Sequence, residues 1–259
     1  MKNRILYLGD IHGNFNLINQ YVKQYGIKDA YIIQVGDFGV GFAPLEKERR
    51  TLGFVNPVLE KNNIMLYAIR GNHDYKPYFD NDPFEFSNIK LLPDYTVLNL
   101  ELDMLGLTET KNILLIGGAV SVDRNWRRTE KQRKGDYTIH PGQSWWNDEI
   151  FVLENDKLVD VRDIDIVVTH TAPDYCPPDN SYGFGPFVEG IIKDTGDVEL
   201  RTDLLVERKQ VTDAFHTLRL NGNDIKHHYY GHFHRSDTIN MYGTKHRLLG
   251  VGELWEERD

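Results

Sequence analysis

Three short apolar segments near the start of the chain each end at a glycine followed by polar residues. They span residues 4–8, 30–35 and 64–69, and they run into the sequences GDIHG, GDFG and RGNHD. Their length and flanking glycines predict β-strands. Amphipathic helical patterns cover residues 14–26 and, with an interruption near Gly53 and Pro57, residues 45–63. This alternation predicts a βαβαβ unit and a partly parallel sheet.

The pattern changes after about residue 89 to β-rich stretches with longer connections. These stretches predict a second sheet, and helical patterns occur near residues 147–155 and 200–222. Two sheets covered by outer helices would bury both sets of apolar faces. Residues 171–198 are rich in Gly, Pro, Asp and aromatic residues and predict a long loop. The β-rich stretches are 96–102, 113–120, 165–170, 227–234 and 246–252.

The length of 259 residues and the absence of repeats or a linker predict one domain over residues 1–259. No apolar run approaches the roughly 18 residues of a membrane span, and only four apolar residues precede Gly9, too few for a signal peptide. We therefore expect a cytoplasmic protein with no membrane partner. The single cysteine, Cys176, excludes an intrachain disulfide and is expected to be a structural thiol rather than a nucleophile.

The net charge of -9 argues against sequence-independent nucleic-acid binding, which requires a basic surface. A small phosphorylated substrate remains compatible with this charge, because bound divalent cations would reverse the local potential.

Five of the ten histidines fall at strand-to-loop junctions beside Gly, Asp or Asn. The carboxyl ends of neighbouring parallel strands share one edge of a sheet, where ligands usually bind. Asp10 and His12 are two residues apart, so in an extended strand both side chains would point the same way. The five junction histidines are His12, His73, His170, His232 and His234. The other five, to which we assign no chemistry, are His140, His216, His227, His228 and His246.

The polar residues at these junctions include enough donors for a metal centre. Asp37 has two oxygens and can bridge two ions, while Asn72 offers a carbonyl oxygen. Imidazoles and carboxylates together suit Mn, Fe or Zn. Two ions about 3.5–4 Å apart would polarise a phosphoryl group and lower the pKa of a bridging water. The seven candidate ligands are Asp10, His12, Asp37, Asn72, His170, His232 and His234. Each motif taken alone is also explained by an ordinary turn.

The ordered blocks D-x-H, GD, GNH[DE], a lone His and GHxH all occur between residues 9 and 234. In this respect the sequence resembles the calcineurin-like metallophosphoesterase superfamily. The resemblance implies an α/β fold, a four-layer αββα sandwich of two mixed sheets flanked by helices. It also implies hydrolysis of phosphomonoesters or small phosphodiesters by metal-activated hydroxide, without a covalent phosphoenzyme.

The resemblance further implies a role for each site residue. His73 is then no ligand, and it stabilises the transition state or protonates the leaving oxygen. Asp74 would orient His73, although an ordinary turn residue is an alternative for Asp74. Two divalent ions per chain are expected, with Mn first and Fe or Zn as alternatives. One ion would bind Asp10, His12 and His234, the other Asn72, His170 and His232, and Asp37 would bridge them.

One departure from the pattern concerns the substrate. In protein serine/threonine phosphatases and dinucleoside-tetraphosphate hydrolases the second block continues into Asp-Arg-Gly, whereas here it reads GDFGVGF. The phosphate-clamping arginine of that branch is missing, which disfavours a phosphoprotein substrate. The basic stretch 117–136 offers Arg124 and Arg127 as replacements, with a solvated charged surface as the alternative.

Two other readings remain open from the sequence. A nuclease of the same superfamily would need a groove with stacking aromatics, for which Trp145 and Trp146 are candidates, but core packing is the favoured interpretation of both. Tyr182, Phe184 and Phe187 could form a rim or lid. A non-catalytic scaffold has no chemical reason to keep both His73 and Asp74. We therefore expect a phosphorylated small molecule as the partner, and a nucleic acid is not favoured.

Overall fold

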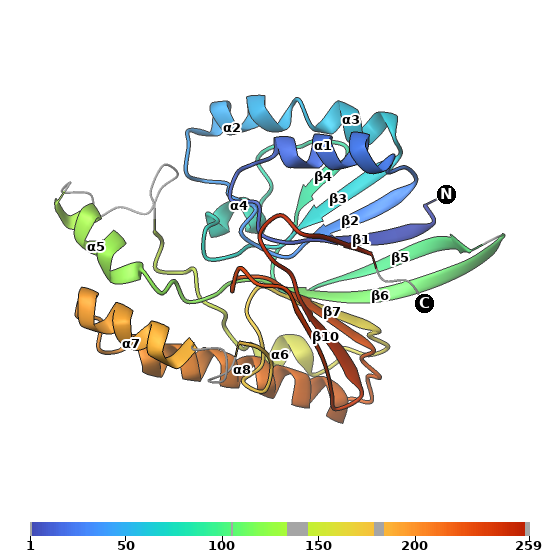
Figure 1. Ribbon diagram of the computed structural model, residues 1–259. Helices are drawn as coiled ribbons and strands as arrows, with labels where there is room; N and C mark the ends of the chain where they lie inside the picture. The colour runs from blue at the N-terminus through green and yellow to red at the C-terminus, as the bar shows by residue number, and fades with distance from the viewer. Residues whose placement is uncertain (1, 105, 134–144, 179–183, 257–259) are drawn as a thin grey trace.

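The computed structural model describes residues 2–104, 106–133, 145–178 and 184–256. Two β-sheets lie face to face in the centre, and helices cover the outer face of each (Figure 1). The first sheet has the strand order β11-β1-β2-β3-β4, and the second has the order β5-β6-β7-β8-β10-β9. The four-layer αββα arrangement expected from the sequence is confirmed.

The first sheet contains the predicted βαβαβ unit. Strands β1 (Arg4–Leu8), β2 (Ala30–Gln34), β3 (Ile64–Ala68) and β4 (Ile89–Leu91) are parallel, and β11 (Leu254–Glu256) pairs antiparallel with β1. Helices α1 (Asn16–Tyr25), α2 (Leu45–Leu52) and α3 (Asn56–Lys61) cover its outer face, and α4 (Lys76–Asp80) follows β3. The partly parallel sheet is confirmed, whereas β4 and β11 were not predicted.

The second sheet is also mixed. Its parallel strands are β6 (Leu107–Ile116), β7 (Ile166–Thr169), β8 (His227–Tyr230) and β10 (Thr244–Leu248). Two antiparallel strands, β5 (Thr96–Met104) and β9 (Asp237–Met241), form its edges. The accompanying helices are α5 (Arg124–Arg133), α6 (Asn155–Leu158), α7 (Phe184–Thr195) and α8 (Leu200–Leu220). Among the described helices, none has the length and apolar character needed to cross a membrane.

Alternation along the strands divides the core into layers. In β1, Leu6 and Leu8 belong to the cluster that includes the buried residues of α1, whereas Tyr7 belongs to the cluster between the two sheets. The ring of Tyr7 stacks on that of Tyr229 from β8, with centroids 3.5 Å apart. Successive side chains of a strand point to opposite faces, so one short strand joins two cores.

The helix predicted near residues 147–155 is absent. No helical residue occurs among 147–154, and α6 begins only at Asn155. The carbonyls of Asp148, Glu149 and Ile150 accept hydrogen bonds from the guanidinium of Arg70 at 3.2, 2.8 and 3.0 Å. Because these backbone groups are bonded to a distant side chain, the helical pattern of the sequence is overridden.

The segment expected as a long loop, residues 171–198, is only partly a loop. Residues 171–178 contain no helix or strand, but α7 occupies residues 184–195. Val188, Ile191 and Ile192 recur at helical spacing and pack in one cluster with Val120. The Gly and Pro content of the segment concealed this apolar helical face.

Candidate metal centre and active site

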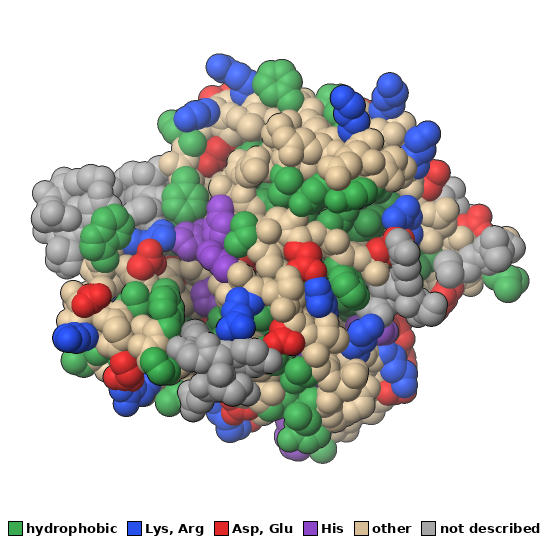
Figure 2. Space-filling model, viewed as in Figure 1, with side chains coloured by type: hydrophobic (Ala, Val, Ile, Leu, Met, Phe, Trp, Pro, Cys, Tyr) green, Lys and Arg blue, Asp and Glu red, His purple; other side chains and the backbone are tan. Residues whose placement is uncertain are grey.

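The seven candidate ligands come together at one edge of the two sheets. Each follows the carboxyl end of a parallel strand, at the end of the sheets that faces α5 and α7 in Figure 1. Figure 2 shows histidine side chains gathered in a hollow of this face, with apolar side chains beside them. Asp10 follows β1, Asp37 follows β2, Asn72 follows β3, His170 follows β7, and both His232 and His234 follow β8, while His12 lies two residues beyond Asp10.

The first group of ligands consists of Asp10, His12, Asp37 and His234, with one ligand atom from each lying within 4.8 Å of the others. Nε2 of His12 is 3.0 Å from Nε2 of His234, which is in turn 3.5 Å from Oδ2 of Asp10. Nδ1 of His12 lies 3.7 Å from Oδ2 of Asp37. Two nitrogens and two carboxylates thus surround one point.

The second group lies on the other side of Asp37. Nε2 of His170 is 3.1 Å from Oδ1 of Asn72 and 3.2 Å from Oδ1 of Asp37. The ring of His232 is near, with its centroid 5.1 Å from that of His170. Nδ1 of His170 lies 2.9 Å from the carbonyl of Val35, an acceptor that takes the ring proton and leaves Nε2 as the ligand atom.

Left-handed turns, rather than extended strands, direct the ligands inward. Strand β1 ends at Leu8 and β8 ends at Tyr230, before any of the ligands. The expectation that Asp10 and His12 point the same way along a continuing strand is therefore wrong. Four ligands have positive φ, which non-glycine residues seldom adopt and which concentrates at functional sites. Their φ values are 44° for His12, 53° for Asp37, 69° for His232 and 53° for His234.

Two glycines leave room for the carboxylates. A Cβ at Gly71 would lie 2.1 Å from Oδ1 of Asp37 and 2.7 Å from Nε2 of His170. A Cβ at Gly231 would lie 2.1 Å from Oδ1 of Asp10. Any larger residue would therefore displace a ligand. This explains why a glycine stands directly before the ligands Asn72 and His232.

The site contains two carboxylates with almost no solvent contact, Asp10 at 0% and Asp37 at 1% exposure. Burial raises the pKa of Asp10 to about 8. Burial is the largest single influence on Asp37 and acts in the same direction, but the neighbouring histidines, His170 first, together outweigh it and hold the pKa of Asp37 well below its usual range. Burial lowers the pKa of His12, His232 and His234, so their rings are neutral and offer lone pairs.

These residues fit a bound transition-metal cation. Within the described residues, Oδ2 of Asp37 is buried and has no hydrogen-bond partner. A buried carboxylate oxygen without a partner is costly, and a cation placed beside it removes that cost. Neutral imidazoles and carboxylates form the donor set that Mn, Fe and Zn accept.

Asp74 holds the loops of the site together instead of orienting His73. Both of its oxygens accept backbone hydrogen bonds, at 2.7 to 3.0 Å. The donors are the N–H groups of Phe38, Gly39, Val40 and Gly71. Asp74 therefore ties the loop after β2, which carries Asp37, to the loop after β3. The expected partnership with the His73 ring is replaced by this structural role.

The ring of His73 lies against Arg127. Nη1 of Arg127 is 3.1 Å from Nδ1 of His73, and Nη2 is 3.4 Å from Nε2. Nε of Arg127 donates to Oδ2 of Asp123 at 2.7 Å. Burial lowers the pKa of His73 to about 4, and the positive charge of Arg127 contributes in the same direction. His73 is thus a neutral imidazole whose more closely approached nitrogen, Nδ1, accepts from Arg127, leaving the proton on Nε2.

Arg124 and Arg127 lie in different surroundings, although both are on α5. Arg124 is 5% exposed and pairs with Asp197 at 2.8 Å and with Asp203 at 2.6 Å. It does not line the cavity at the site, whereas Arg127 does. The structure therefore gives Arg124 the role of attaching α5 to the start of α8, and the expected phosphate contact is not met for this residue.

A cavity of about 810 Å³ opens over the ligands. Its polar part contains His12, Asp37, Asn72, His73, His232 and His234, and its apolar part contains Val122, Phe187, Ile191 and Phe233. The expected rim position of Phe187 agrees with this lining. Tyr182 and the side chain of Phe184 lie outside the described residues.

The two tryptophans proposed for stacking do not line this cavity. Trp146 is fully buried and packs against Phe42 and Tyr75, with ring centroids 5.2 and 5.6 Å away. The guanidinium of Arg128 lies over the ring of Trp145, 4.5 Å from its centroid. Core packing is therefore the role of Trp146, and Trp145 pairs with a cation.

Ser121 and Glu149 are site residues that the sequence analysis missed. Nδ2 of Asn72 donates to Oγ of Ser121 at 2.9 Å, and this hydroxyl donates to Oε2 of Glu149 at 2.8 Å. The chain of bonds turns the carbonyl oxygen of Asn72 toward His170. Ser121 lies shortly beyond the end of β6, a parallel neighbour of β7. Inspection of the polar residues that follow the carboxyl end of each parallel strand, which located the other site residues, would also have identified Ser121.

Several solved structures are similar to this chain at low sequence identity, among them the following three. GAP50, the anchor in the inner membrane complex of Plasmodium, has a TM-score of 0.48 at 15% identity, covering 96% of this chain and 72% of its own. A structure described as a 5′-nucleotidase from Staphylococcus aureus has a TM-score of 0.48 at 14% identity, covering 96% and 49%. Phosphopantetheinyl hydrolase from Mycobacterium tuberculosis has a TM-score of 0.41 at 12% identity, covering 97% and 92%.

The family assignment comes from the sequence itself. No curated protein matches the chain. The sequence model of the calcineurin-like phosphoesterase family, in contrast, matches residues 3–236, which include all five ligand-bearing junctions. With this match, the two-sheet fold and the convergent ligands, the chain belongs to the calcineurin-like phosphoesterases and is a metal-dependent hydrolase of phosphoester bonds.

Proposed function

We propose that this protein is a dinuclear phosphoesterase that acts on phosphomonoesters or small phosphodiesters. The observation that carries the proposal is the position of Asp37. Its Oδ2 faces His12 in the first ligand group, and its Oδ1 faces His170 in the second. A carboxylate with a ligand group on each side is the arrangement required to bridge two ions.

In this proposal one ion binds Asp10, His12 and His234, and the other binds Asn72, His170 and His232. Manganese is the first candidate, because oxygen and imidazole donors are both present, and Fe or Zn are the alternatives. When bound, two such ions polarise the phosphoryl group and supply the nucleophile by lowering the pKa of a water.

The cavity supports a small substrate. A volume of about 810 Å³ falls within the range of small-molecule sites, about 300–1,000 Å³. The apolar wall of Phe187, Ile191 and Val122 would contact the organic part of the ester. The net charge of -9 disfavours a polynucleotide. A cytoplasmic location remains part of the proposal, supported by the single buried cysteine.

In this proposal His73 acts on the leaving oxygen of the ester, and Arg127 contacts the phosphate oxygens. Nε2–H of His73 donates a hydrogen bond to the leaving oxygen, and transfer of the proton to that oxygen requires the imidazolium form, in which Nδ1 has also taken up a proton. Arg127 keeps Asp123 as a partner through Nε, and its two terminal nitrogens face His73 at the cavity. These nitrogens form a planar fork suited to two phosphate oxygens.

The proposed function is tested by metal removal. Purified protein treated with a chelator should lose turnover of chromogenic phosphomonoesters and diesters, and added Mn should restore it more fully than Mg. Metal analysis of the active protein should give close to two ions per chain. Turnover that survives complete removal of the ions would refute the proposal. Cleavage of a short oligonucleotide in preference to the small esters would favour a nuclease instead.

The substitution His73→Ala should separate substrates by their leaving groups. Turnover of an alkyl phosphate should fall about 10²–10⁴-fold, because its leaving oxygen needs a proton, while a nitrophenyl phosphate should lose less than about tenfold. Arg127→Ala provides the comparison, since loss of a phosphate contact should raise KM equally for both esters. Equal losses of kcat for the two esters in His73→Ala would rule out proton donation by His73.

A further inference from the structure

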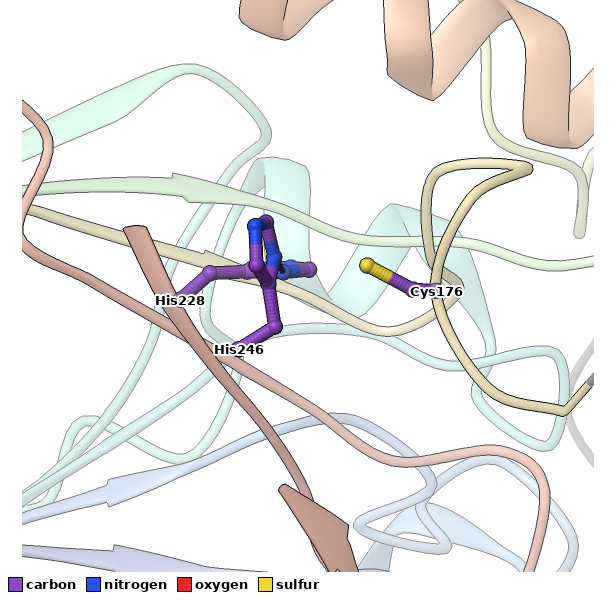
Figure 3. Close-up of side chains that lie close together, drawn as sticks. All are labelled: Cys176, His228 and His246. Atoms are coloured by element: carbon purple, nitrogen blue, oxygen red, sulfur yellow. Dashed lines mark hydrogen bonds between the residues drawn. The ribbon is translucent and has the colours of Figure 1, made fainter. Parts of the chain in front are cut away.

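A second group of potential ligands lies outside the active site, on the outer face of the second sheet. It consists of Cys176, His228 and His246, one ligand atom of each lying within 4.8 Å of the others. All three are 0% exposed. Figure 3 shows the sulfur of Cys176 directed at the two imidazoles. No part of the proposed phosphoesterase mechanism uses these residues.

The sheet places the two histidines side by side. His228 on β8 and His246 on β10 are register partners in neighbouring parallel strands. Register partners point to the same face of a sheet. This face is covered by α8, because Phe215 of that helix lies over both rings, with centroids 4.8 and 5.7 Å away.

The position of Cys176 is set by a buried arginine. Cys176 lies in the loop after β7, and the guanidinium of Arg208 from α8 donates to the carbonyls of Pro173, Cys176 and Pro178. The side chain of Tyr230 also donates to the carbonyl of Pro177 at 2.9 Å. The thiol is therefore held against the sheet independently of any contact with the histidines.

The hydrogen bonds of the histidine pair leave one nitrogen unsatisfied. The hydroxyl of Thr169 donates its single proton to the carbonyl of Thr171, so toward His228 it must accept a hydrogen bond from Nε2–H, at 2.8 Å. Nδ1 of neutral His228 is then a lone pair, and it lies 2.9 Å from Nδ1 of His246. This contact requires the proton of His246 on Nδ1, which leaves Nε2 of His246 bare.

That bare nitrogen is the unexplained feature of the cluster. In the part of the chain that the structure describes, Nε2 of His246 is buried and has no hydrogen-bond partner. An ion bound by both Nδ1 atoms would place the proton of His246 on Nε2 instead. Each metal-bound imidazole would then carry its proton on the ring nitrogen that does not bind the ion, as histidine ligands in proteins usually do.

The close nitrogen pair has a counterpart in the active site. There Nε2 of His12 and Nε2 of His234 are 3.0 Å apart and belong to one ligand group. Both pairs consist of neutral rings. Burial, with further contributions from His246 and Arg219, lowers the pKa of His228 well below its usual value, and burial lowers the pKa of His246 to about 4.

We propose that Cys176, His228 and His246 form a second, structural metal site that takes a thiophilic ion, Zn²⁺ or Cu⁺. One thiolate with two imidazoles suits these ions and not Mg²⁺ or Ca²⁺. Binding releases the thiol proton of Cys176 to solvent and forms one metal–sulfur and two metal–nitrogen bonds. The ion would fasten the loop 171–178, which directly follows His170, to β10 and to β8, the strand that leads into the loop of His232.

The single cysteine of the sequence makes a specific test possible. None of the seven candidate ligands of the active site is a thiolate, so a sulfur-to-cobalt charge-transfer band can arise only at Cys176. The full chain is produced in medium containing Co²⁺ and its absorption spectrum is recorded. We expect the band in the wild-type protein and its loss in Cys176→Ser.

Metal analysis separates the two candidate ions and provides controls. Protein produced with Zn²⁺, or with copper under reducing conditions, should contain one more equivalent of the preferred ion than Cys176→Ser contains. His246→Asn should lose the same equivalent, while His216→Asn, an exposed histidine on α8, should retain it. Phosphoesterase activity with Mn is measured on each protein. This assay tests the proposed phosphoesterase function independently of metal binding at Cys176, His228 and His246.

Two results would overturn this proposal. One is folded wild-type protein that lacks the charge-transfer band after production with Co²⁺. The other is a metal content that does not change in Cys176→Ser and His246→Asn. Either result would assign the cluster to a hydrogen-bonded histidine pair beside a core thiol.

Discussion

The substitution Asp37→Asn should lower kcat for phosphoester hydrolysis by at least about 10³-fold, equivalent to about 4 kcal/mol of transition-state stabilisation. The amide keeps the shape of the side chain, and its oxygen can still accept the 2.7 Å hydrogen bond from the backbone N–H of His73. The amide nitrogen would take the place of Oδ2, the buried atom without a hydrogen-bond partner among the described residues. The fold should therefore survive while the bridging charge is lost.

Kinetics and metal analysis of the same preparation check this prediction. Metal content should fall from close to two ions per chain to one or fewer, because a neutral amide cannot hold two cations together. Asp213→Asn is the matched control, since Asp213 is a surface residue of α8 paired with Lys209. An Asp37→Asn protein that keeps both its ions and its turnover would contradict the bridging role.

The substitution Asp74→Ala should destabilise the protein by about 3 kcal/mol or more, because it leaves four backbone N–H groups without their acceptor at a buried position. At about 2–4 °C per kcal/mol for a chain of this size, the melting temperature should fall by about 6–12 °C. Activity should fall as well, since the same carboxylate joins the loops that carry Asp37 and Asn72.

Thermal unfolding distinguishes this structural role from the orienting role expected from the sequence. A residue that only oriented His73 would reduce turnover with little change in melting temperature. Asp80→Ala is the control, because the ion pair of Asp80 with Lys76 lies at the surface, and its loss should change the stability by less than about 0.5 kcal/mol. A melting temperature of Asp74→Ala equal to that of the control would disprove the loop-holding role.

The order of the ligand motifs and their association with strand ends could be predicted from the sequence. Apolar runs of strand length followed by glycine and polar residues identify the ends of strands, and alternation with helices makes the strands of the first sheet parallel. Parallel strands place their carboxyl ends at one edge, so Asp10, Asp37 and Asn72 had to lie near one another. This argument is local in sequence, and local patterns are sufficient for it.

The directions of the ligands required the tertiary structure. The spacing of Asp10 and His12 predicted a shared face only if the strand continued, but the chain instead turns through a left-handed conformation at His12. Such a conformation is costly for a non-glycine residue and persists only where surrounding contacts impose it. Those contacts, such as the hydrogen bond from the N–H of His12 to the carbonyl of Asp37, join different strands.

The two arginines of α5 show the same limit. Arg124 and Arg127 are both arginines and lie three residues apart, so no local pattern in the sequence separates their roles. Their roles depend on partners far along the chain, since Asp197 binds Arg124 and His73 contacts Arg127. The side chain of Arg70, which bonds the carbonyls of residues 148–150, overrode a helical pattern for a similar reason.

The sequence by itself determined which donors this protein contains and at which strand ends they lie, because glycine punctuation and apolar periodicity are properties of neighbouring residues. Only the tertiary structure decided which donors meet. The grouping of Asp37 with both ligand sets, and of Cys176 with His228 and His246, depends on the register of strands and the packing of helices between segments far apart in the chain. Such contacts leave no pattern in the sequence near either partner.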